Sequence, residues 1–250
     1  MRTSPTHPLQ IVSAEPRSGF GRVGITFCPS KKQQSAMTGG WNRDLGLDLD
    51  VVSAFGASVL VTLIEQQEIE ELAVQGIGKE TCRRSMDWLH IPIRDVSVPG
   101  QGFEAAWQLY GPGLRGRLRD GFNIVVHCKG WLGRAGMIAA RLLIELGADP
   151  EKVIAQVRHV RPGAIETAEQ EAYVRSLKPV RESSPARWTR MRLLIELKAL
   201  FSALLYLIFI LVHAADIQDR DGAVDVLKAI RYRFPWLRHV FADGGYAAFN

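Results

Sequence analysis

The sequence predicts an α/β domain whose mostly parallel sheet is flanked by helices. Apolar runs of strand length alternate with stretches of helical periodicity from about residue 10 to residue 178. The apolar runs are rich in Val, Ile, Phe or Trp, which favour strands. Gly56 and Gly147 follow two of the helical stretches, at the place where helices commonly end. Strands that alternate with helices are typical of α/β folds with a parallel sheet.

Each element is expected from the periodicity of its own segment. The expected strands are Gly24–Cys28, Ser58–Leu63, Trp88–Ile93 and Asn123–Cys128. The expected helices are Leu47–Phe55, Glu65–Ala73, Lys79–Met86, Phe103–Arg119, Ala135–Leu146, Pro150–Val160 and Glu166–Leu177. Because a helix lies between most successive strands, those strands are expected to run parallel.

Composition excludes several classes of protein. With 47% hydrophobic and 23% charged residues, the 250-residue chain is not expected to be disordered. Its three cysteines, Cys28, Cys82 and Cys128, cannot build a disulfide framework and form no C-x-x-C metal pair, so we expect a reducing, cytoplasmic location. We interpret Cys28 and Cys82 as structural. The net charge of +5 suits a phosphate-bearing partner without indicating nucleic acid.

The chain is expected to divide into three parts. Residues 1–180 form the α/β domain, residues 181–198 form a polar linker that contains proline, and residues 199–250 form a tail. The tail begins with "ALFSALLYLIFILVHAA", residues 199–215, which is apolar almost throughout. This segment is just short of a comfortable membrane span, so we interpret it as a buried helix or two strands, with membrane association as the alternative.

The segment "NIVVHCKGWLGRAGMIAARLLIELG", residues 123–147, predicts a strand, a loop and a helix with an anion site between them. Backbone N–H groups at a helix N-terminus bind phosphate, and the planar guanidinium of Arg134 can hold two phosphate oxygens at once. These charges favour the thiolate form of Cys128. A thiolate facing a phosphate is placed for in-line attack on phosphorus. The alternative is that Cys128 is only a small buried apolar residue.

The segment "HIPIRDVSVPG", residues 90–100, supplies a candidate general acid. The leaving oxygen of a phosphate monoester departs poorly unless it receives a proton. Asp95 follows a predicted strand and lies between Pro92 and Pro99, so its loop can close over the site as a lid. The alternative is that Asp95 caps a turn.

These residues are similar to a known family. Residues 20–178 resemble the cysteine-dependent protein tyrosine and dual-specificity phosphatases, whose signature is His-Cys-x-x-Gly-x-x-Arg. The resemblance is strongest to the cyclin-dependent-kinase-associated phosphatase group and bacterial relatives. It implies Cys128 as nucleophile, Arg134 as phosphate clamp and Asp95 as general acid. "RPGAIETAEQEAYV", residues 161–174, resembles the final family segment, in which Gln170 orients water for hydrolysis of the thiophosphate.

The resemblance also implies which groups bind the substrate. The residues expected to hold it are Lys129, Gly130, Trp131, Leu132, Gly133 and Arg134. His127 is expected to support the loop by hydrogen bonding. The implied substrate is a phosphorylated protein or a small phosphomonoester, with no metal or other cofactor, and the chain is expected to be a monomer.

Two positions depart from the family pattern. Trp131 stands where the family has glycine, and any side chain costs about 1–3 kcal/mol if the loop needs a positive φ there. The alternative function is therefore a catalytically impaired pseudophosphatase. Ala135 replaces a Ser or Thr that stabilises the departing thiolate, which predicts a slower second step. Lys31 and Lys32 could steer a phosphorylated substrate, but we interpret them as an exposed, solvated pair.

The tail resembles a different family. Residues 210–247, with "HAADIQDRDGA" and "FPWLRHVFADGGYA", are similar to the RNase-H-like core of insertion-sequence DDE transposases. Asp243 matches one of three catalytic carboxylates, and one carboxylate cannot build a two-metal site. We therefore expect a truncated strand–helix–strand fragment without transposase activity. DNA binding through Arg231, Arg233 and Arg238 is the alternative, and a nucleic-acid partner is not expected.

Overall fold

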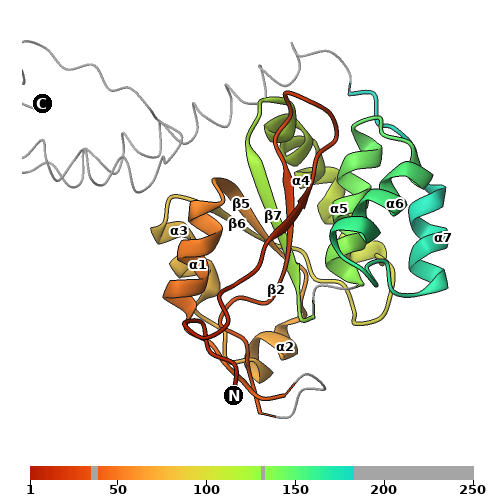
Figure 1. Cartoon of the computed structure of the whole chain (residues 1–250). Helices are drawn as coiled ribbons and strands as arrows, with labels where there is room; N and C mark the ends of the chain where they lie inside the picture. Colours follow the sequence, from red (N-terminus) through yellow and green to blue (C-terminus); the bar gives the residue numbers. More distant parts are fainter. Residues whose placement is uncertain (35–38, 131–132, 183–250) are drawn as a thin grey trace, which may run out of the picture. The chain divides into compact units, whose positions relative to one another are not determined.

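A five-stranded mixed sheet forms the centre of the domain, in a computed structural model that describes residues 1–34, 39–130 and 133–182. The strand order is β1-β2-β7-β5-β6, and helices flank both faces (Figure 1). Every neighbouring pair is parallel except β1 with β2. The strands are β1 (Val12–Ala14), β2 (Val23–Phe27), β5 (Ala57–Thr62), β6 (Asp87–His90) and β7 (Asn123–Cys128). The predicted α/β class with a mostly parallel sheet is confirmed.

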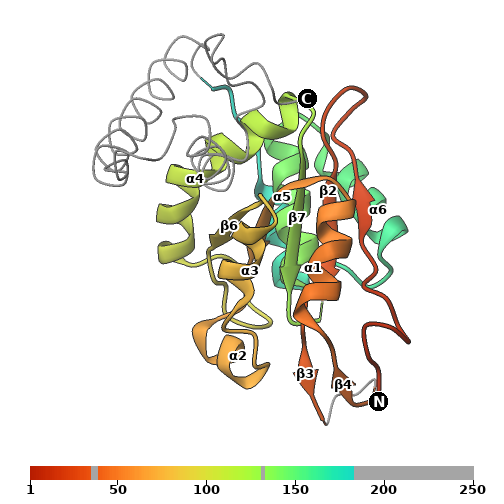
Figure 2. The same ribbon diagram turned by 90° about the vertical axis from the view of Figure 1, so that its left-hand side faces the viewer.

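The helices divide between the two faces of this sheet. One face carries α1 (Leu45–Ala54) and α3 (Ile77–Arg83), and the other carries α4 (Gln101–Arg119), α5 (Arg134–Glu145), α6 (Pro150–Val160) and α7 (Ala168–Ser176) (Figure 1). The short helix α2 (Gln66–Glu71) follows β5. A two-stranded antiparallel ribbon, β3 (Lys32–Gln33) and β4 (Trp41–Asn42), extends below α1 in Figure 2.

The alternation of side chains along β7 explains why it is central. Ile124, Val126 and Cys128 belong to the hydrophobic cluster on the α5 face, whereas Val125 belongs to the cluster on the α1 face. A strand that is apolar on both faces is typical of a parallel sheet covered by helices. All twelve residues of α5 are buried, because this helix packs under α4, α6 and α7 as well as on the sheet. The carboxyl end of β7 is thereby fixed next to the start of α5.

Element bounds differ from the predicted ones where local signals are weak. The bounds of β7 and α6 agree with prediction, and Gly56 and Gly147 have φ values of 78° and 105° beyond the ends of their helices, as predicted. Helix α7 begins after Thr167, because the Thr167 side chain accepts a hydrogen bond from the Gln170 N–H. Strands β1, β3 and β4 were not predicted, since two or three residues carry too little periodicity.

The predicted tail lies outside the described residues. Residues 183–198 of the linker, the apolar segment 199–215 and the transposase-like residues 210–247 all belong to this part. Of the helices in the described ranges, none is long and apolar enough to cross a bilayer. The predicted division into domain, linker and tail stays a prediction.

Candidate active site

The candidate site lies at the carboxyl edge of the parallel strands. Strand β7 ends at Cys128, which is only 3% exposed and faces Phe27 of β2 in register. Six residues later Arg134 begins helix α5. This strand–loop–helix arrangement is the one predicted for an anion site. Trp131 and Leu132 lie outside the described residues, so the question raised by Trp131 stays open.

Arg134 is held from three sides. Its Nη1 and Nη2 donate to Glu68 Oε2 at 2.6 Å and Oε1 at 2.9 Å, and Nη1 also donates to the Ile93 carbonyl at 2.9 Å. Its Nη2 is 2.9 Å from Asp95 Oδ1. The two-pronged pair with Glu68 fixes the plane of the guanidinium. The structure therefore brings Arg134 and Asp95 together and adds Glu68.

Glu68 was missed by the sequence analysis. It lies at the third position of α2, where its carboxylate also accepts a hydrogen bond from the N–H of Glu65 in a capping box. Burial acts to raise the pKa of Glu68, but the hydrogen bonds from Arg134 and Glu65 outweigh it and hold that pKa below its usual value. The capping pattern is visible in the sequence, but its partner Arg134 is not.

Asp95 lies on a solvent-exposed loop. Its side chain is 57% exposed, in contrast with the buried guanidinium that it contacts. Its Oδ1 also accepts a hydrogen bond from the N–H of Val96 at 3.1 Å, so Asp95 both stabilises a local turn and reaches the site. Val96 has φ of 56°, an uncommon conformation for a β-branched residue.

Gln170 connects three segments of the site. The Gln170 side chain accepts a hydrogen bond from the Glu166 N–H at 3.0 Å and donates to the Ser97 carbonyl of the acid loop at 3.3 Å. A Cβ added at Gly133 would lie 2.9 Å from Gln170 Oε1 and 3.0 Å from Glu166 Oε2. The backbone of the phosphate loop therefore passes directly beside this amide, and a side chain at Gly133 would displace the Gln170 amide or the Glu166 carboxylate.

His127 is buried and neutral. The His127 Nε2 and the Thr62 hydroxyl form a 2.8 Å hydrogen bond, and the same hydroxyl accepts one from the Trp88 indole. Burial, with a smaller contribution from the charge of Arg134, lowers the pKa of His127 to about 3. A side chain that stays neutral at pH 7 is suited to support a loop and not to carry a proton.

The lysines near the site differ from expectation. The interpretation of Lys31 as exposed is wrong, because this residue is only 8% exposed, whereas Lys32 is exposed as predicted. Lys129, the first residue after Cys128, pairs with Glu71 at 3.2 Å. Cys28 is fully buried, which raises the pKa of its thiol. Cys82 is exposed on α3 and lies outside the site.

The site combines a buried cysteine at the end of a central parallel strand with an arginine at the start of the next helix and an aspartate on a separate loop. This combination defines a class, the cysteine-dependent phosphatases. Comparison with protein families agrees with this class. Residues 34–174, more than half of the chain, match a family described as "PTP-SAK: Swiss Army Knife protein, DSP-PTPase phosphatase domain". The chain belongs to this family, and its domain is a phosphatase domain of the dual-specificity type.

Individual relatives agree with this family. Cyclin-dependent kinase inhibitor 3 of Rattus norvegicus is 34% identical over 139 residues, which cover 54% of this chain and 64% of that protein, less than two thirds of its length. The structure of a kinase associated phosphatase, with its catalytic-site cysteine replaced by serine, gives a TM-score of 0.58 at 23% identity over 67% of this chain and 92% of that chain. The active form of Tk-PTP gives 0.50 at 25% identity, covering 67% and 96%.

Proposed function

We propose that this domain hydrolyses phosphate monoesters through a cysteinyl-phosphate on Cys128. The observation that carries the proposal is the arrangement of Arg134, a buried guanidinium at the start of α5 that Glu68 orients and Asp95 contacts at 2.9 Å. Since Glu68 occupies one side of the guanidinium, the contact with exposed Asp95 is the one that a phosphate can replace.

The first step transfers the phosphoryl group to sulfur. The thiolate of Cys128 attacks phosphorus, the Sγ–P bond forms, and the bond from phosphorus to the leaving oxygen breaks. Asp95, released from Arg134 when the phosphate binds, takes up a proton from solvent and donates it to that oxygen. Arg134 and the N–H groups of the loop stabilise the charge on the phosphoryl oxygens throughout.

The second step regenerates the thiol group. Water attacks phosphorus, the P–Sγ bond breaks, and Cys128 leaves as a thiolate while Asp95, now a carboxylate, accepts a proton from the water. Gln170 positions that water, because its amide lies beside Gly133 and reaches the acid loop at Ser97. Ala135 supplies no hydroxyl to the departing sulfur, so we expect this step to limit the rate.

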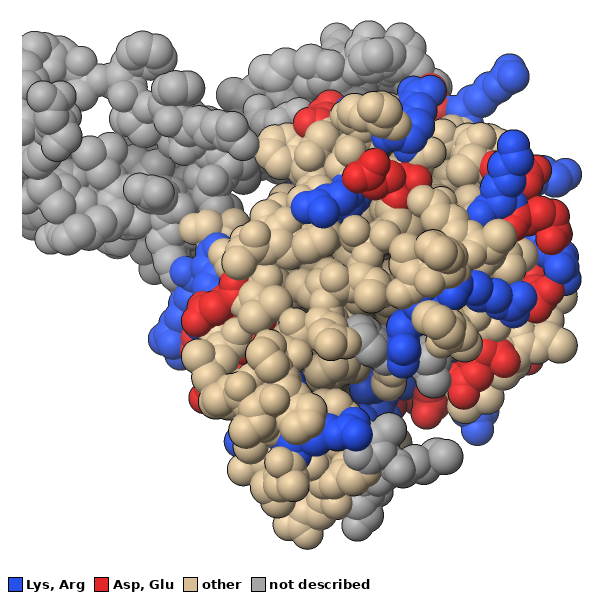
Figure 3. Space-filling model, in the orientation of Figure 1, with Lys and Arg blue, Asp and Glu red and all other residues tan. Residues whose placement is uncertain are grey.

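The substrate is a phosphotyrosine or a phosphoserine/threonine in a protein. Support comes from the relatives, which include a kinase associated phosphatase and a cyclin-dependent kinase inhibitor. On the face drawn in Figure 3, basic and acidic side chains are interspersed, whereas a nucleic-acid interface collects its basic residues on one surface. We also propose that the protein acts as a monomer in the cytoplasm.

Hydrolysis of para-nitrophenyl phosphate tests the proposal. The full chain is expected to hydrolyse it, and Cys128→Ser is expected to be inert, since serine at this position lacks an anionic nucleophile at neutral pH. Cys82→Ser, which replaces an exposed cysteine away from the site, is the matched control and keeps activity. If the native chain and Cys128→Ser are equally inert while Trp131→Gly is active, the native protein is not a working enzyme and the proposal fails.

A further inference from the structure

Glu166 places a carboxylate against the last residue of the phosphate loop. Its Oε2 lies 3.0 Å from the position that a Cβ at Gly133 would take, directly before Arg134 and helix α5. Glu166 is exposed and belongs to the short segment between α6 and α7. The proposed chemistry gives this residue no role, although its carboxylate borders the loop that is proposed to bind the phosphate.

The segment that carries Glu166 is fixed by three helices. Arg158 of α6 donates a hydrogen bond from Nε to the Ala164 carbonyl at 3.2 Å. Ala164 packs against Gly136 of α5, where an added Cβ would lie 2.9 Å from the Ala164 Cβ. The N–H of Glu166 donates to the side chain of Gln170 on α7 at 3.0 Å. The backbone of Glu166 is therefore preorganised, so its carboxylate extends from a fixed point beside the loop.

Glu166 forms no ion pair among the residues that the structure describes. The other carboxylates close to the loop have cationic partners, in the pairs Glu68–Arg134, Asp95–Arg134 and Glu71–Lys129. An unpaired carboxylate beside the loop repels a phosphate, because like charges at short range weaken binding. A cation that arrives with the substrate would offset this repulsion and supply the missing partner.

The first residue of the loop has a different environment from the last. Lys129 lines a hollow of about 500 Å³ together with Lys32 of strand β3. Glu71 lines the same hollow and pairs with Lys129 at 3.2 Å, so it offsets one of the two positive charges. A basic residue of the substrate is therefore repelled at the Lys129 end of the loop and attracted at the Glu166 end.

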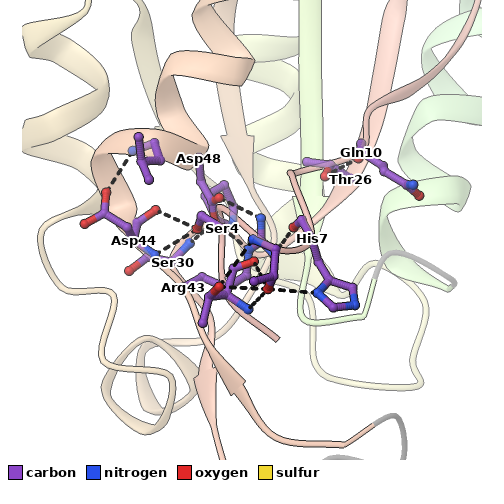
Figure 4. A network of polar contacts seen from close by, with 12 residues as sticks. Ser4, His7, Gln10, Thr26, Ser30, Arg43, Asp44 and Asp48 are labelled. Atoms are coloured by element: carbon purple, nitrogen blue, oxygen red, sulfur yellow. Dashed lines mark hydrogen bonds and ion pairs between the residues drawn. The ribbon is translucent and has the colours of Figure 1, made fainter. Parts of the chain in front are cut away.

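The ribbon that carries Lys32 is anchored by a buried ion pair. Asp48 accepts hydrogen bonds from the Ser30 N–H at 2.8 Å and from Arg43 Nε and Nη2 at 2.8 and 2.7 Å (Figure 4). Ser30 lies two residues before β3, and Arg43 directly follows β4. Both ends of the ribbon are thereby fixed, so the difference in charge between the two ends of the loop rests on anchored segments.

We propose that Glu166 selects substrates that carry arginine or lysine next to the phosphorylated residue. The inference rests on the proposed function and names a substrate class within it, a phosphorylated polypeptide with a basic flanking residue. Glu166 pairs with the flanking cation while the phosphate occupies the loop between Lys129 and Gly133. A small phosphomonoester without such a cation leaves the carboxylate unpaired and is a poorer substrate.

Peptides of one sequence test this specificity. Each carries a phosphotyrosine, with arginine directly before it, with arginine directly after it, or with alanine at both places. We expect kcat/KM for one of the arginine peptides to exceed that for the alanine peptide about 2- to 5-fold, the contribution of a partly exposed ion pair. The advantage shrinks as the salt concentration rises. The ratio compares two substrates of the same variant, so a change in basal activity cancels.

Variants of the carboxylate assign the preference to Glu166. In Glu166→Gln the ratio is expected to fall to one, and Glu166→Lys is expected to prefer a peptide with glutamate in place of the arginine. Glu169→Gln is the matched control, because it removes an exposed carboxylate in the first turn of α7, and it keeps the preference for arginine.

Three outcomes overturn the inference or the proposal beneath it. Equal kcat/KM for the alanine peptide and both arginine peptides, or a preference that persists in Glu166→Gln, overturns the role of Glu166. Equal losses for all three peptides in Glu166→Gln also overturn it, since Glu166 then acts on the phosphate or the water. If the native chain hydrolyses none of the peptides, the proposed function fails instead. The affinities of the same peptides for the full chain with Cys128→Ser then test Glu166 separately.

Discussion

Helix α5 carries two buried arginines with different environments. Arg134 and Arg141 lie seven residues apart, about two helical turns, so they share one side of the helix. Each forms ion pairs with two carboxylates: Arg134 with Glu68 and Asp95, and Arg141 with Glu104 and Glu145. Burial and charge pairing by themselves therefore do not tell a functional arginine from a structural one.

The partners make the difference. Around Arg141, Glu145 is buried and also accepts hydrogen bonds from Trp107 and Arg115, and the Tyr173 hydroxyl accepts one from Arg141 at 2.5 Å. These partners come from helices that pack against one another. Glu104, the other partner of Arg141, is 39% exposed but lies on helix α4, whereas the exposed partner of Arg134, Asp95, lies on a loop. An arginine whose partner can leave is able to receive a ligand, whereas one enclosed by helices holds them together.

Backbone strain also differs between the surroundings of Arg134 and those of Arg141. Of the five non-glycine residues with positive φ in the described ranges, Val96 directly follows Asp95, Ile165 directly precedes Glu166, whose N–H donates to Gln170, and Ser30 lies three residues beyond the end of β2. None lies in α4, α5 or α7, which surround Arg141. Strained residues persist where the surrounding structure fixes them, and they gather at functional sites. The N–H of Ser30, for example, is held by Asp48.

The largest effect is expected from Arg134→Lys. Lysine keeps the charge but cannot bind Glu68 and a phosphate in two-pronged geometry. We expect kcat/KM for para-nitrophenyl phosphate to fall by about 10³-fold, the upper range for losing one transition-state donor. Steady-state kinetics, with folding checked by circular dichroism, measures this loss. Retention of near-native kcat/KM would show that Arg134 is as structural as Arg141.

Arg141→Met is expected to act on stability instead. Arg141→Met removes the arginine that pairs with Glu104, while buried Glu145 keeps Arg115 and Trp107, so we expect a loss of about 1.5–3 kcal/mol in the free energy of unfolding. Activity per folded molecule is expected to change little. The matched control is Arg175→Met, whose pair with Glu151 is exposed and contributes roughly 0.2–1 kcal/mol. Equal losses in urea denaturation of the two variants would contradict the buried role of Arg141.

Asp95→Asn tests whether Asp95, the exposed partner of Arg134, acts as the general acid. An amide cannot donate the proton that the leaving oxygen needs, so kcat/KM for a phosphotyrosine peptide, which reports the first step, is expected to fall by roughly 10²-fold or more. The loss is expected to be smaller for para-nitrophenyl phosphate, because its leaving group needs less protonation. The free energy of unfolding changes little, since the Asp95 side chain is exposed. Equal losses for both substrates would indicate a role in binding only.

Features that depend on a local sequence pattern could be predicted, whereas those that depend on contacts between distant segments could not. Strand β7, helix α6 and the spacing of Cys128 and Arg134 were predictable, because each depends on a local pattern or a short motif. Asp95 was predictable from its proline-flanked loop. Glu68 was not, because its bond to Arg134 joins positions 66 residues apart. The burial of Lys31 was not predictable either, since it depends on Asp48 and Arg43 from the following elements.

The smallest effect is expected from Val96→Gly, which tests the strain beside Asp95. A positive φ costs a β-branched residue about 1–3 kcal/mol, and glycine removes that cost. Glycine also gains conformational entropy in the unfolded chain, which offsets about 0.4–1 kcal/mol. We therefore expect the free energy of unfolding to stay equal or rise slightly. Val98→Gly is the matched control, because Val98 packs against the hydrophobic core and lacks a positive φ, so its loss destabilises the fold. If urea denaturation shows equal destabilisation for both valines, Val96 is not strained, and the division between a strained site and an unstrained helical cluster fails at its acid loop.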